Sequence, residues 1–333
     1  MTEVRLAPPG RKEIREAASR IAGIAVRTPL LRLPPRAGEP EIWLKLETLQ
    51  PIGSFKIRGA ANAMAQAPRE ALARGVVTAS AGNMAQGVAW CAREAGVPCT
   101  VVVPDNAPRA KLDAIERLGA RLIPLPFEQW WRVLVERHYD GAEGFFVHPV
   151  SDAAVIAGNA TIGLEILDDL PHVGAVLVPF GGGGLSCGIA SALRAVGSLA
   201  PAFACEVETA APFAASLAAG EPRAIDHRPS FVDGIGGRGM LREMWPLAST
   251  LLTGSFVVTL KEIADAIRVL VSRARTVAEG AGAAALAAAL AEREGHGAAG
   301  VSVPLPAGPI VCVVSGGNLD PAKLAMILGG KLP

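Results

Sequence analysis

A lysine at the start of an apolar helical pattern, Lys56, is the first residue that suggests chemistry. It follows Gly53-Ser54-Phe55. A lysine that is partly desolvated near helix N-termini has a lowered pKa, which suits Schiff-base chemistry with a carbonyl compound. A lysine taken alone is more often an exposed surface residue. Lys56 is therefore a candidate whose weight depends on the motifs that accompany it.

A run of four glycines, residues 181–184, directly follows the apolar segment 175–180. Glycines let the backbone turn sharply and bring its N–H groups close to an anion. The helix expected from Leu185 adds its positive N-terminus at the same place. This pattern predicts a phosphate site, with a purely structural turn as the alternative.

The glycine run does not have the spacing of a dinucleotide site. The third glycine of G-x-G-x-x-G is missing in every register, because Ser186 or Cys187 occupies its place. Glu206 and Glu208 follow at a distance that suits a ribose contact. A nicotinamide-dependent oxidoreductase therefore stays an alternative, whereas a Walker loop is excluded because no lysine follows the glycines.

Two further loops have small and polar residues after an apolar segment. One reads Ser80-Ala81-Gly82-Asn83, and the other reads Ser315-Gly316-Gly317-Asn318. Backbone N–H groups together with the Ser80 and Asn83 side chains can hold a carboxylate. The alternative is ordinary capping of the helix that follows.

Strand and helix patterns alternate along the chain and place these loops. Strands are expected at 76–80, 99–104, 175–179, 203–207 and 310–315, and helices at 109–118, 159–167, 185–196 and 260–278. Such alternation predicts an α/β fold of βαβ units with a mostly parallel sheet covered by helices. Ligands bind outside the carboxyl ends of strands in such sheets, which is where the glycine and serine loops fall.

Composition restricts the partners and the compartment. The 333 residues are 50% hydrophobic, and 32 Lys and Arg against 31 Asp and Glu give a net charge of +1. This balance disfavours nucleic acid and anionic membranes as partners. The alanine-rich run 281–291 is too short to span a bilayer, and residues 1–20 contain no signal peptide. We expect a cytoplasmic enzyme with five reduced cysteines in or near its core: Cys91, Cys99, Cys187, Cys205 and Cys312.

Taken together and in order, the motifs resemble the fold-type II pyridoxal-phosphate enzymes (tryptophan synthase β-like), in the threonine/serine dehydratase and serine racemase branch. The resemblance covers nearly the whole chain. Its motifs are Arg27-Thr28-Pro29-Leu30-Leu31, Gly53-Ser54-Phe55-Lys56, Ser80-Ala81-Gly82-Asn83, His148-Pro149, Ile156-Ala157-Gly158, the four glycines, Asp233-Gly234-Ile235, Glu279-Gly280-Ala281-Gly282-Ala283 and Ser315-Gly316-Gly317-Asn318.

The resemblance implies roles for individual residues. Lys56 would carry pyridoxal 5'-phosphate and then act as the base at the substrate Cα. The other cofactor-binding residues would be Phe55 and Gly234 at the ring, Asn83 at the phenolic oxygen, Gly181, Gly182, Gly183 and Gly184 at the phosphate, and Ser315 at the pyridine nitrogen. The substrate would contact Ser54, Ser80, Ala81, Gly82, Asn83 and Met84.

It also implies the organisation of the molecule. Residues 1–68 and 150–333 would form a large cofactor-binding domain, and residues 69–149 a small mobile domain. The cofactor would lie in the cleft between them. We expect a homodimer and a small amino-acid substrate. Because the chain ends at Pro333, we expect no C-terminal regulatory domain and no feedback inhibition.

Three positions depart from the family pattern. Met84 stands where the family usually has histidine, which makes a bulkier substrate side chain plausible. Ala81 stands where racemases carry a serine that acts as acid on the second face of the substrate, so elimination is favoured over racemisation. Glu208 matches the first carboxylate of a divalent-cation site, but Ala214 replaces the expected aspartate, so we expect no metal.

Two tryptophans are also unusual. Trp130 and Trp131 stand where we expect smaller residues before a helix. They are interpreted as a cover over the substrate entrance, as a subunit contact, or as simple packing of the smaller domain. His138 and His148 are given no catalytic role, because a lone histidine is more often structural.

The sequence therefore predicts a pyridoxal-phosphate-dependent ammonia-lyase of amino-acid metabolism. It would convert a hydroxy-amino acid such as L-threonine or L-serine to a 2-oxo acid and ammonia by β-elimination. The alternatives are racemisation, β-replacement, dehydration of a bulkier 3-hydroxy-amino acid, and the nicotinamide-dependent oxidoreductase.

Overall fold

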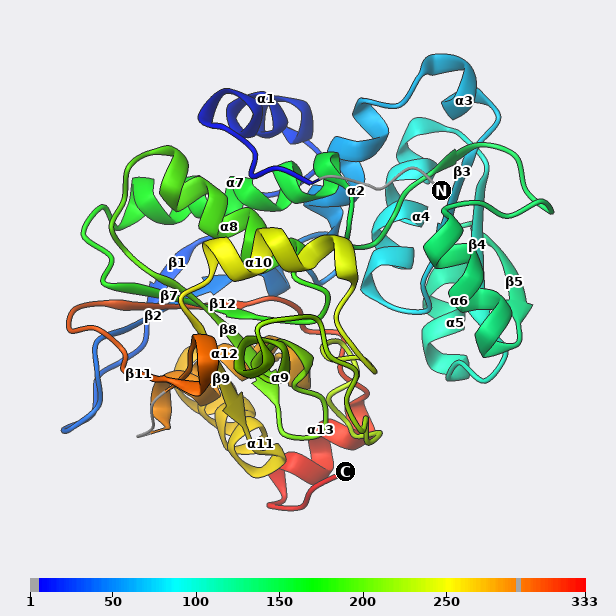
Figure 1. The fold of residues 1–333 in the computed structure, drawn as a ribbon. Helices are drawn as coiled ribbons and strands as arrows, with labels where there is room; N and C mark the ends of the chain where they lie inside the picture. The colour runs from blue at the N-terminus through cyan, green and yellow to red at the C-terminus, as the bar shows by residue number, and fades with distance from the viewer. Residues whose placement is uncertain (1–5, 292–294) are drawn as a thin grey trace.

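The computed structural model describes residues 6–291 and 295–333, which form two sheets covered by helices (Figure 1). In the described residues, the larger sheet has eight strands in the order β1-β2-β12-β7-β8-β9-β10-β11. Its central strands run parallel, and β1, β10 and β11 pair antiparallel with their neighbours. The strands are β1 (Leu30–Arg32), β2 (Ile42–Leu46), β7 (Ala175–Pro179), β8 (Ala202–Val207), β9 (Gly254–Val258), β10 (Gly295–His296), β11 (Ser302–Val303) and β12 (Ile310–Val314).

The central strands of this sheet are apolar on both faces because helices cover both. Every residue of β7, β8 and β12 is buried. Cys312 of β12 lies opposite Leu44 and Leu177, and all three face one core cluster, whereas Val311 and Val313 face the other. This alternation is the period of two expected of a strand buried between two helix layers.

The helix layers lie on opposite sides of the sheet (Figure 1). One contains α1 (Arg11–Ile21), α7 (Ala153–Asp169), α8 (Gly184–Ala195), α9 (Pro212–Ala219) and α10 (Trp245–Leu251). The other contains α11 (Leu260–Val269), α12 (Gly280–Leu290) and α13 (Pro321–Leu328). Short turns add η1 (Glu47–Leu49), η2 (Arg242–Met244), η3 (Leu270–Ala274) and η4 (Ala298–Gly300).

The smaller sheet has four parallel strands in the order β5-β4-β3-β6 among the residues described. It consists of β3 (Val76–Ala79), β4 (Cys99–Pro104), β5 (Arg121–Leu125) and β6 (Phe145–Phe146), with α3 (Arg69–Ala73), α4 (Asn83–Ala95), α5 (Arg109–Glu116) and α6 (Phe127–Glu136). Helix α2 (Lys56–Ala65) packs against both α4 and α7, and so joins the two sheet units. All strands of this small unit fall within 69–149, and the division into a large domain and a small mobile domain stays a prediction.

The predicted fold class is confirmed, and two local predictions are wrong. The helix expected at 260–278 ends at Val269, since a π-helical turn follows at 270–274 and Arg275 takes a left-handed conformation with φ 56°. Trp130 and Trp131 lie inside α6, not before a helix. All five cysteines are free and buried. Within the described ranges, every helix is too short or too polar to span a bilayer.

Candidate active site

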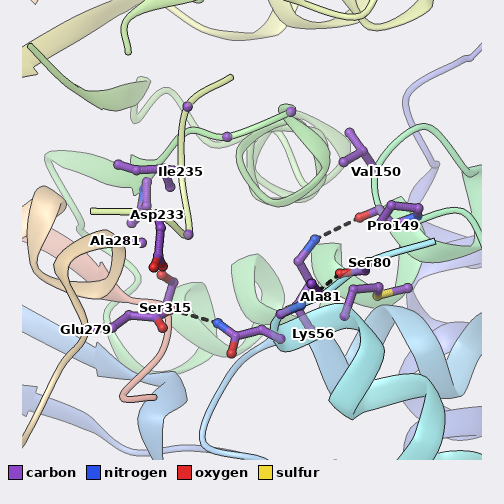
Figure 2. A pocket seen from close by; sticks show the side chains of 18 of the residues that line it. Lys56, Ser80, Ala81, Pro149, Val150, Asp233, Ile235, Glu279, Ala281 and Ser315 are labelled. Atoms are coloured by element: carbon purple, nitrogen blue, oxygen red, sulfur yellow. Dashed lines mark hydrogen bonds between the residues drawn. The ribbon is translucent and has the colours of Figure 1, made fainter. Parts of the chain in front are cut away.

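A cavity of about 430 Å³ lies where strands of both sheets end (Figure 2). That size is in the range of small-molecule sites. Its wall contains nearly every residue that the sequence predicted: Phe55, Lys56, Ser80, Ala81, Gly82, Asn83, Met84, Gly181, Gly182, Gly183, Gly184, Gly234 and Ser315. The loops after β7 and β12 of the larger sheet thus meet the loop after β3 of the smaller sheet at one place.

Lys56 is the first residue of α2, and its side chain extends along the cavity wall. Its Nζ donates a hydrogen bond to the carbonyl oxygen of Pro149 at 2.8 Å and lies 5.2 Å from the ring centroid of Phe55. Burial lowers the pKa of Lys56 to about 8, although the Glu279 carboxylate opposes this shift. A nucleophilic neutral amine is therefore accessible close to neutral pH.

His148 shapes the turn that presents the Pro149 carbonyl to Lys56. Its Nδ1 accepts the backbone N–H groups of Val150 at 3.1 Å and Ser151 at 2.8 Å. Burial, reinforced by nearby positive charge, lowers the pKa of His148 to about 3. A neutral, buried imidazole in this position is a structural acceptor.

The glycine loop after β7 forms an anion cradle. Gly183 has a φ of 92°, and a Cβ at Gly182 would lie 2.5 Å from Cγ1 of Val150, so side chains are not accommodated here. In the described part of the chain, the N–H groups of residues 181–184 have no hydrogen-bond acceptor. These free donors at the N-terminus of α8 fit a phosphate.

The loop after β3 brings small residues and Asn83 to the cavity. Gly82 is the N-cap of α4, and its N–H donates to Oγ of Ser80 at 3.3 Å. Met84 is only 2% exposed and packs mostly into the core of the small unit, so it offers little surface to a ligand. Ala81 has no group that can transfer a proton.

Ser315 closes the wall after β12 and is 3% exposed. Its carbonyl oxygen accepts the backbone N–H of Phe55 at 3.0 Å, which holds the lysine loop against the serine loop. Ser54, for which a substrate contact was predicted, lies outside the cavity lining, and that contact stays a prediction. Ser54 is fully buried behind the wall, and its Oγ accepts the backbone N–H of Lys56 at 3.4 Å.

Glu279 is a site residue to which the sequence reasoning assigned no role. It lines the cavity beside Ser315 (Figure 2), and its Oε1 accepts the Nδ2 hydrogen of Asn83 at 2.7 Å. Burial raises the pKa of Glu279 to about 7, against the hydrogen bond from Asn83. The sequence signal was its place at the start of the family motif Glu279-Gly280-Ala281-Gly282-Ala283, directly before the small-residue helix that begins at Gly280.

Charged and aromatic side chains border the cavity where the small unit faces the loop after α9. Lys111 of α5 pairs with Asp233 at 2.8 Å, and both line the cavity. The Arg238 guanidinium lies 4.8 Å from the ring centroid of Phe127 in α6. Trp130 lines the cavity, whereas Trp131 is 40% exposed.

Glu208 lies at the end of β8, and its carboxylate caps a helix. Its Oε1 accepts the N–H of Leu260 at the start of α11 at 2.9 Å. Residues 6–291 and 295–333 contain no cluster of three or more histidine, cysteine, aspartate or glutamate side chains that could hold a metal ion.

The arrangement fits pyridoxal 5'-phosphate. Lys56 offers an amine with a lowered pKa, the glycine cradle offers unpaired donors for the phosphate, and Asn83 and Ser315 offer polar groups between them. These are the functional groups that hold an aldehyde cofactor with a phosphate tail.

Comparisons with known proteins agree with this fit. Residues 21–316 match the family model described as pyridoxal-phosphate dependent enzyme. An L-threonine ammonia-lyase of Thermotoga maritima is 38% identical over 299 residues, covering 88% of this chain and 71% of that protein. A catabolic L-threonine dehydratase of Staphylococcus aureus is 35% identical over 324 residues, covering 95% and 91%.

Solved structures share the fold. The structure of maize serine racemase superposes with a TM-score of 0.83 at 30% identity, covering 97% of this chain and 98% of the racemase. The activity for which this structure is named differs from that of the two relatives above, so the branch contains both racemases and ammonia-lyases.

Proposed function

The chain belongs to the pyridoxal-phosphate-dependent enzyme family, in its threonine dehydratase and serine racemase branch, and from this premise we propose that it is an ammonia-lyase. Its substrate would be a hydroxy-amino acid such as L-threonine or L-serine, and its products a 2-oxo acid and ammonia. Membership of this family sets aside the nicotinamide-dependent oxidoreductase.

The observation that carries the proposal is the environment of Lys56. Its amine, with a pKa of about 8, lies in one cavity with the glycine cradle after β7 and the serine loop after β3. A covalent anchor, a phosphate site and a carboxylate site are the three parts that such a lyase needs.

Each residue of the site has its own role in the proposed reaction. When bound, the cofactor supplies the electron sink that weakens bonds at the substrate Cα. Lys56 would hold the cofactor, and its amine, once freed, would take the proton from Cα. The loop from Ser80 to Asn83 would bind the substrate carboxylate with backbone N–H groups and the amide. Phe55 and Gly234 would flank the cofactor ring, and Ser315 would contact the pyridine nitrogen.

Elimination is favoured over racemisation at this site. Racemisation needs a second proton donor on the face of the substrate opposite the lysine. Ala81 supplies none. A substrate with a larger side chain than threonine is the second candidate. The buried side chain of Met84, on which that idea depended, offers it little surface.

Compartment and assembly belong to the same proposal. A balanced net charge of +1 and five buried thiols are consistent with a cytoplasmic enzyme of amino-acid metabolism. We propose a homodimer on the family resemblance.

The test combines a spectrum with a product assay. Purified protein and the Lys56→Ala variant are loaded with pyridoxal phosphate, and their absorbance is recorded between about 300 and 500 nm, where a lysine-bound cofactor absorbs. L-threonine and L-serine are then added, and 2-oxo acid and ammonia are measured. The proposal predicts a visible band and product release in the wild type, and neither in Lys56→Ala.

Three other outcomes are informative. A band without product from either amino acid supports the cofactor and moves the substrate to a bulkier 3-hydroxy-amino acid. Inversion of the amino acid without 2-oxo acid would establish the racemase alternative. Absence of the band after loading would refute the proposal.

A further inference from the structure

We propose that Glu279 is a positioning residue that sets the orientation of the Asn83 side-chain amide, so that an N–H of that amide faces the cavity. This inference rests on the proposed function, because it concerns how Asn83 meets the cofactor and the substrate. In this role Glu279 contacts Asn83 and needs no contact with the reacting atoms.

The orientation is fixed from one end by a backbone group. Nδ2 of Asn318 donates to the carbonyl oxygen of Ile52 at 2.9 Å. A carbonyl oxygen only accepts hydrogen bonds, so the NH₂ group of Asn318 must point this way. The same Nδ2 donates to Oδ1 of Asn83 at 2.7 Å. The Asn83 oxygen is therefore held toward Asn318.

Glu279 fixes the Asn83 amide from the other side. Nδ2 of Asn83 donates to Oε1 of Glu279 at 2.7 Å. If the Asn83 amide turned over, its oxygen would face the carboxylate oxygen and its NH₂ group would face that of Asn318. Both contacts would be repulsive, so the two neighbours select one orientation. One N–H of Asn83 remains for a group bound in the cavity, whose wall Asn83 forms.

Both neighbours lie close to glycines of the adjoining loops. Glu279 is 8% exposed, and its backbone N–H donates to the carbonyl oxygen of Gly316 at 3.0 Å. A Cβ at Gly316 would lie 2.6 Å from Oε1 of Glu279, and a Cβ at Gly53 would lie 2.8 Å from Oδ1 of Asn318. The glycines of the two neighbouring loops thus leave just enough room for this hydrogen-bonded chain.

Orientation by Glu279 does not require its negative charge. The pKa of Glu279 is about 7, raised by burial, so both protonation states occur near neutral pH. A protonated carboxyl group keeps a carbonyl oxygen that accepts from Asn83. Glutamine keeps the same acceptor, whereas alanine removes it. This difference separates positioning from an electrostatic role.

The experiment uses four variants of the full chain. Glu279→Gln keeps the acceptor, Glu279→Ala removes it, and Asn318→Asp sets an acceptor against Oδ1 of Asn83 with little change of shape. Glu221→Gln is the matched control, because Glu221 lies on the surface and pairs only with Arg223 among the residues described. Apoprotein is titrated with pyridoxal phosphate to obtain Kd and the visible spectrum, and KM and kcat are measured with L-threonine.

We expect Glu279→Gln and the control to stay within about threefold of the wild type in Kd, with an unchanged band. Glu279→Ala and Asn318→Asp should raise Kd about tenfold or more and shift the band, since a directed hydrogen bond to the ligand is lost. Their KM for L-threonine should rise as well.

Two results would overturn the inference while leaving the proposed function intact. One is a wild-type Kd and spectrum in Glu279→Ala; the other is equal damage in Glu279→Gln and Glu279→Ala, which would mean that charge matters and orientation does not. If Glu279→Ala does not fold, Asn318→Asp decides, and wild-type binding in that variant rejects the inference. A wild type without any cofactor band would instead overturn the proposed function, and this inference with it.

Discussion

The amine of Lys56 lies in a buried environment that disfavours its charged form. Its Nζ has a single backbone carbonyl as hydrogen-bond partner within the described chain, and the nearest carboxylate that raises its pKa, Glu279, is itself buried. The lowered pKa of about 8 is thus a property of the apoprotein. It determines how readily the protein captures an aldehyde.

Capture of pyridoxal phosphate by the apoprotein should therefore accelerate as pH rises, with a midpoint near 8. Only the neutral amine attacks the aldehyde, and the protonated fraction of Lys56 grows as pH falls below its pKa. An exposed lysine would give a midpoint near its ordinary pKa of about 10.4. Stopped-flow absorbance from pH 6 to pH 10 measures the rate. A midpoint close to that of free lysine would contradict the burial described above, and Lys56→Ala gives the background rate.

Sequence reasoning assigned a role to Lys56 but none to Glu279, and the reason is the distance along the chain. Lys56 belongs to a local motif, and its neighbours in sequence are also its neighbours in space. Glu279 meets Asn83 across a separation of 196 residues. No local pattern encodes that contact, because Asn83 begins the helix after β3 of the smaller sheet and Glu279 is the N-cap of α12, which packs on the larger sheet.

At the scale of elements, helix α2 is held by a buried ionic network. Arg58 of α2 pairs with Glu47 at 2.8 Å and with Glu165 of α7 at 2.6 Å. Lys45 of β2 is fully buried and pairs with Glu165 at 2.6 Å. The network joins β2, α2 and α7, so it fixes the helix whose first residue is Lys56.

Glu47→Ala should destabilise the protein by about 3–5 kcal/mol, because it leaves the Arg58 guanidinium buried without this partner. Burial alone would raise the pKa of Glu47, but the attraction and hydrogen bonds of Arg58 outweigh it and lower the pKa. The stabilisation is therefore full at neutral pH and is lost as pH falls through the lowered pKa. Urea denaturation measures the effect.

The control for this variant is Glu41→Ala. The ion pair of Glu41 with Arg32 is largely exposed on both sides, and such pairs contribute about 0–1 kcal/mol. Equal losses in the two variants would mean that the buried network contributes no more than a surface pair.

The same network explains the unusual sequence of β2. A strand buried on both faces usually reads as an uninterrupted apolar run, as in β7 and β12. Lys45 breaks that run in β2, and only its pairing with Glu165 makes its burial possible. The helix expected at 260–278 is shorter in the structure for a different reason. Its apolar period continues past Val269, although the backbone changes there to a π-helical turn.

At the scale of the whole molecule, two side-chain contacts join α5 and α6 of the small unit to the large unit beside the cavity. Lys111 of α5 pairs with Asp233, and Phe127 of α6 lies under the Arg238 guanidinium. Asp233 and Arg238 lie on the same loop of the large unit. These contacts therefore join α5 and α6 to the loop that carries Gly234.

Removing both contacts, as in a Lys111→Ala/Phe127→Ala variant, should loosen the closure between the units. The ion pair is partly exposed and contributes about 0–1 kcal/mol. The cation–π contact contributes about 0.5–1 kcal/mol. Global stability should therefore fall little, whereas amide hydrogen exchange in α5 and α6 should increase, because local opening depends on just such contacts.

A surface control separates local opening of α5 and α6 from a general loss of stability. Lys261→Ala removes an exposed i,i+4 pair within α11, far from the cavity loops in sequence, and should change neither α5 nor α6. If the double variant opens the cleft, KM for the amino acid should rise together with hydrogen exchange in the small unit, since the same opening admits water and releases the ligand. Unchanged exchange in α5 and α6 would mean that these two contacts do not restrain the movement of residues 69–149 that we predicted.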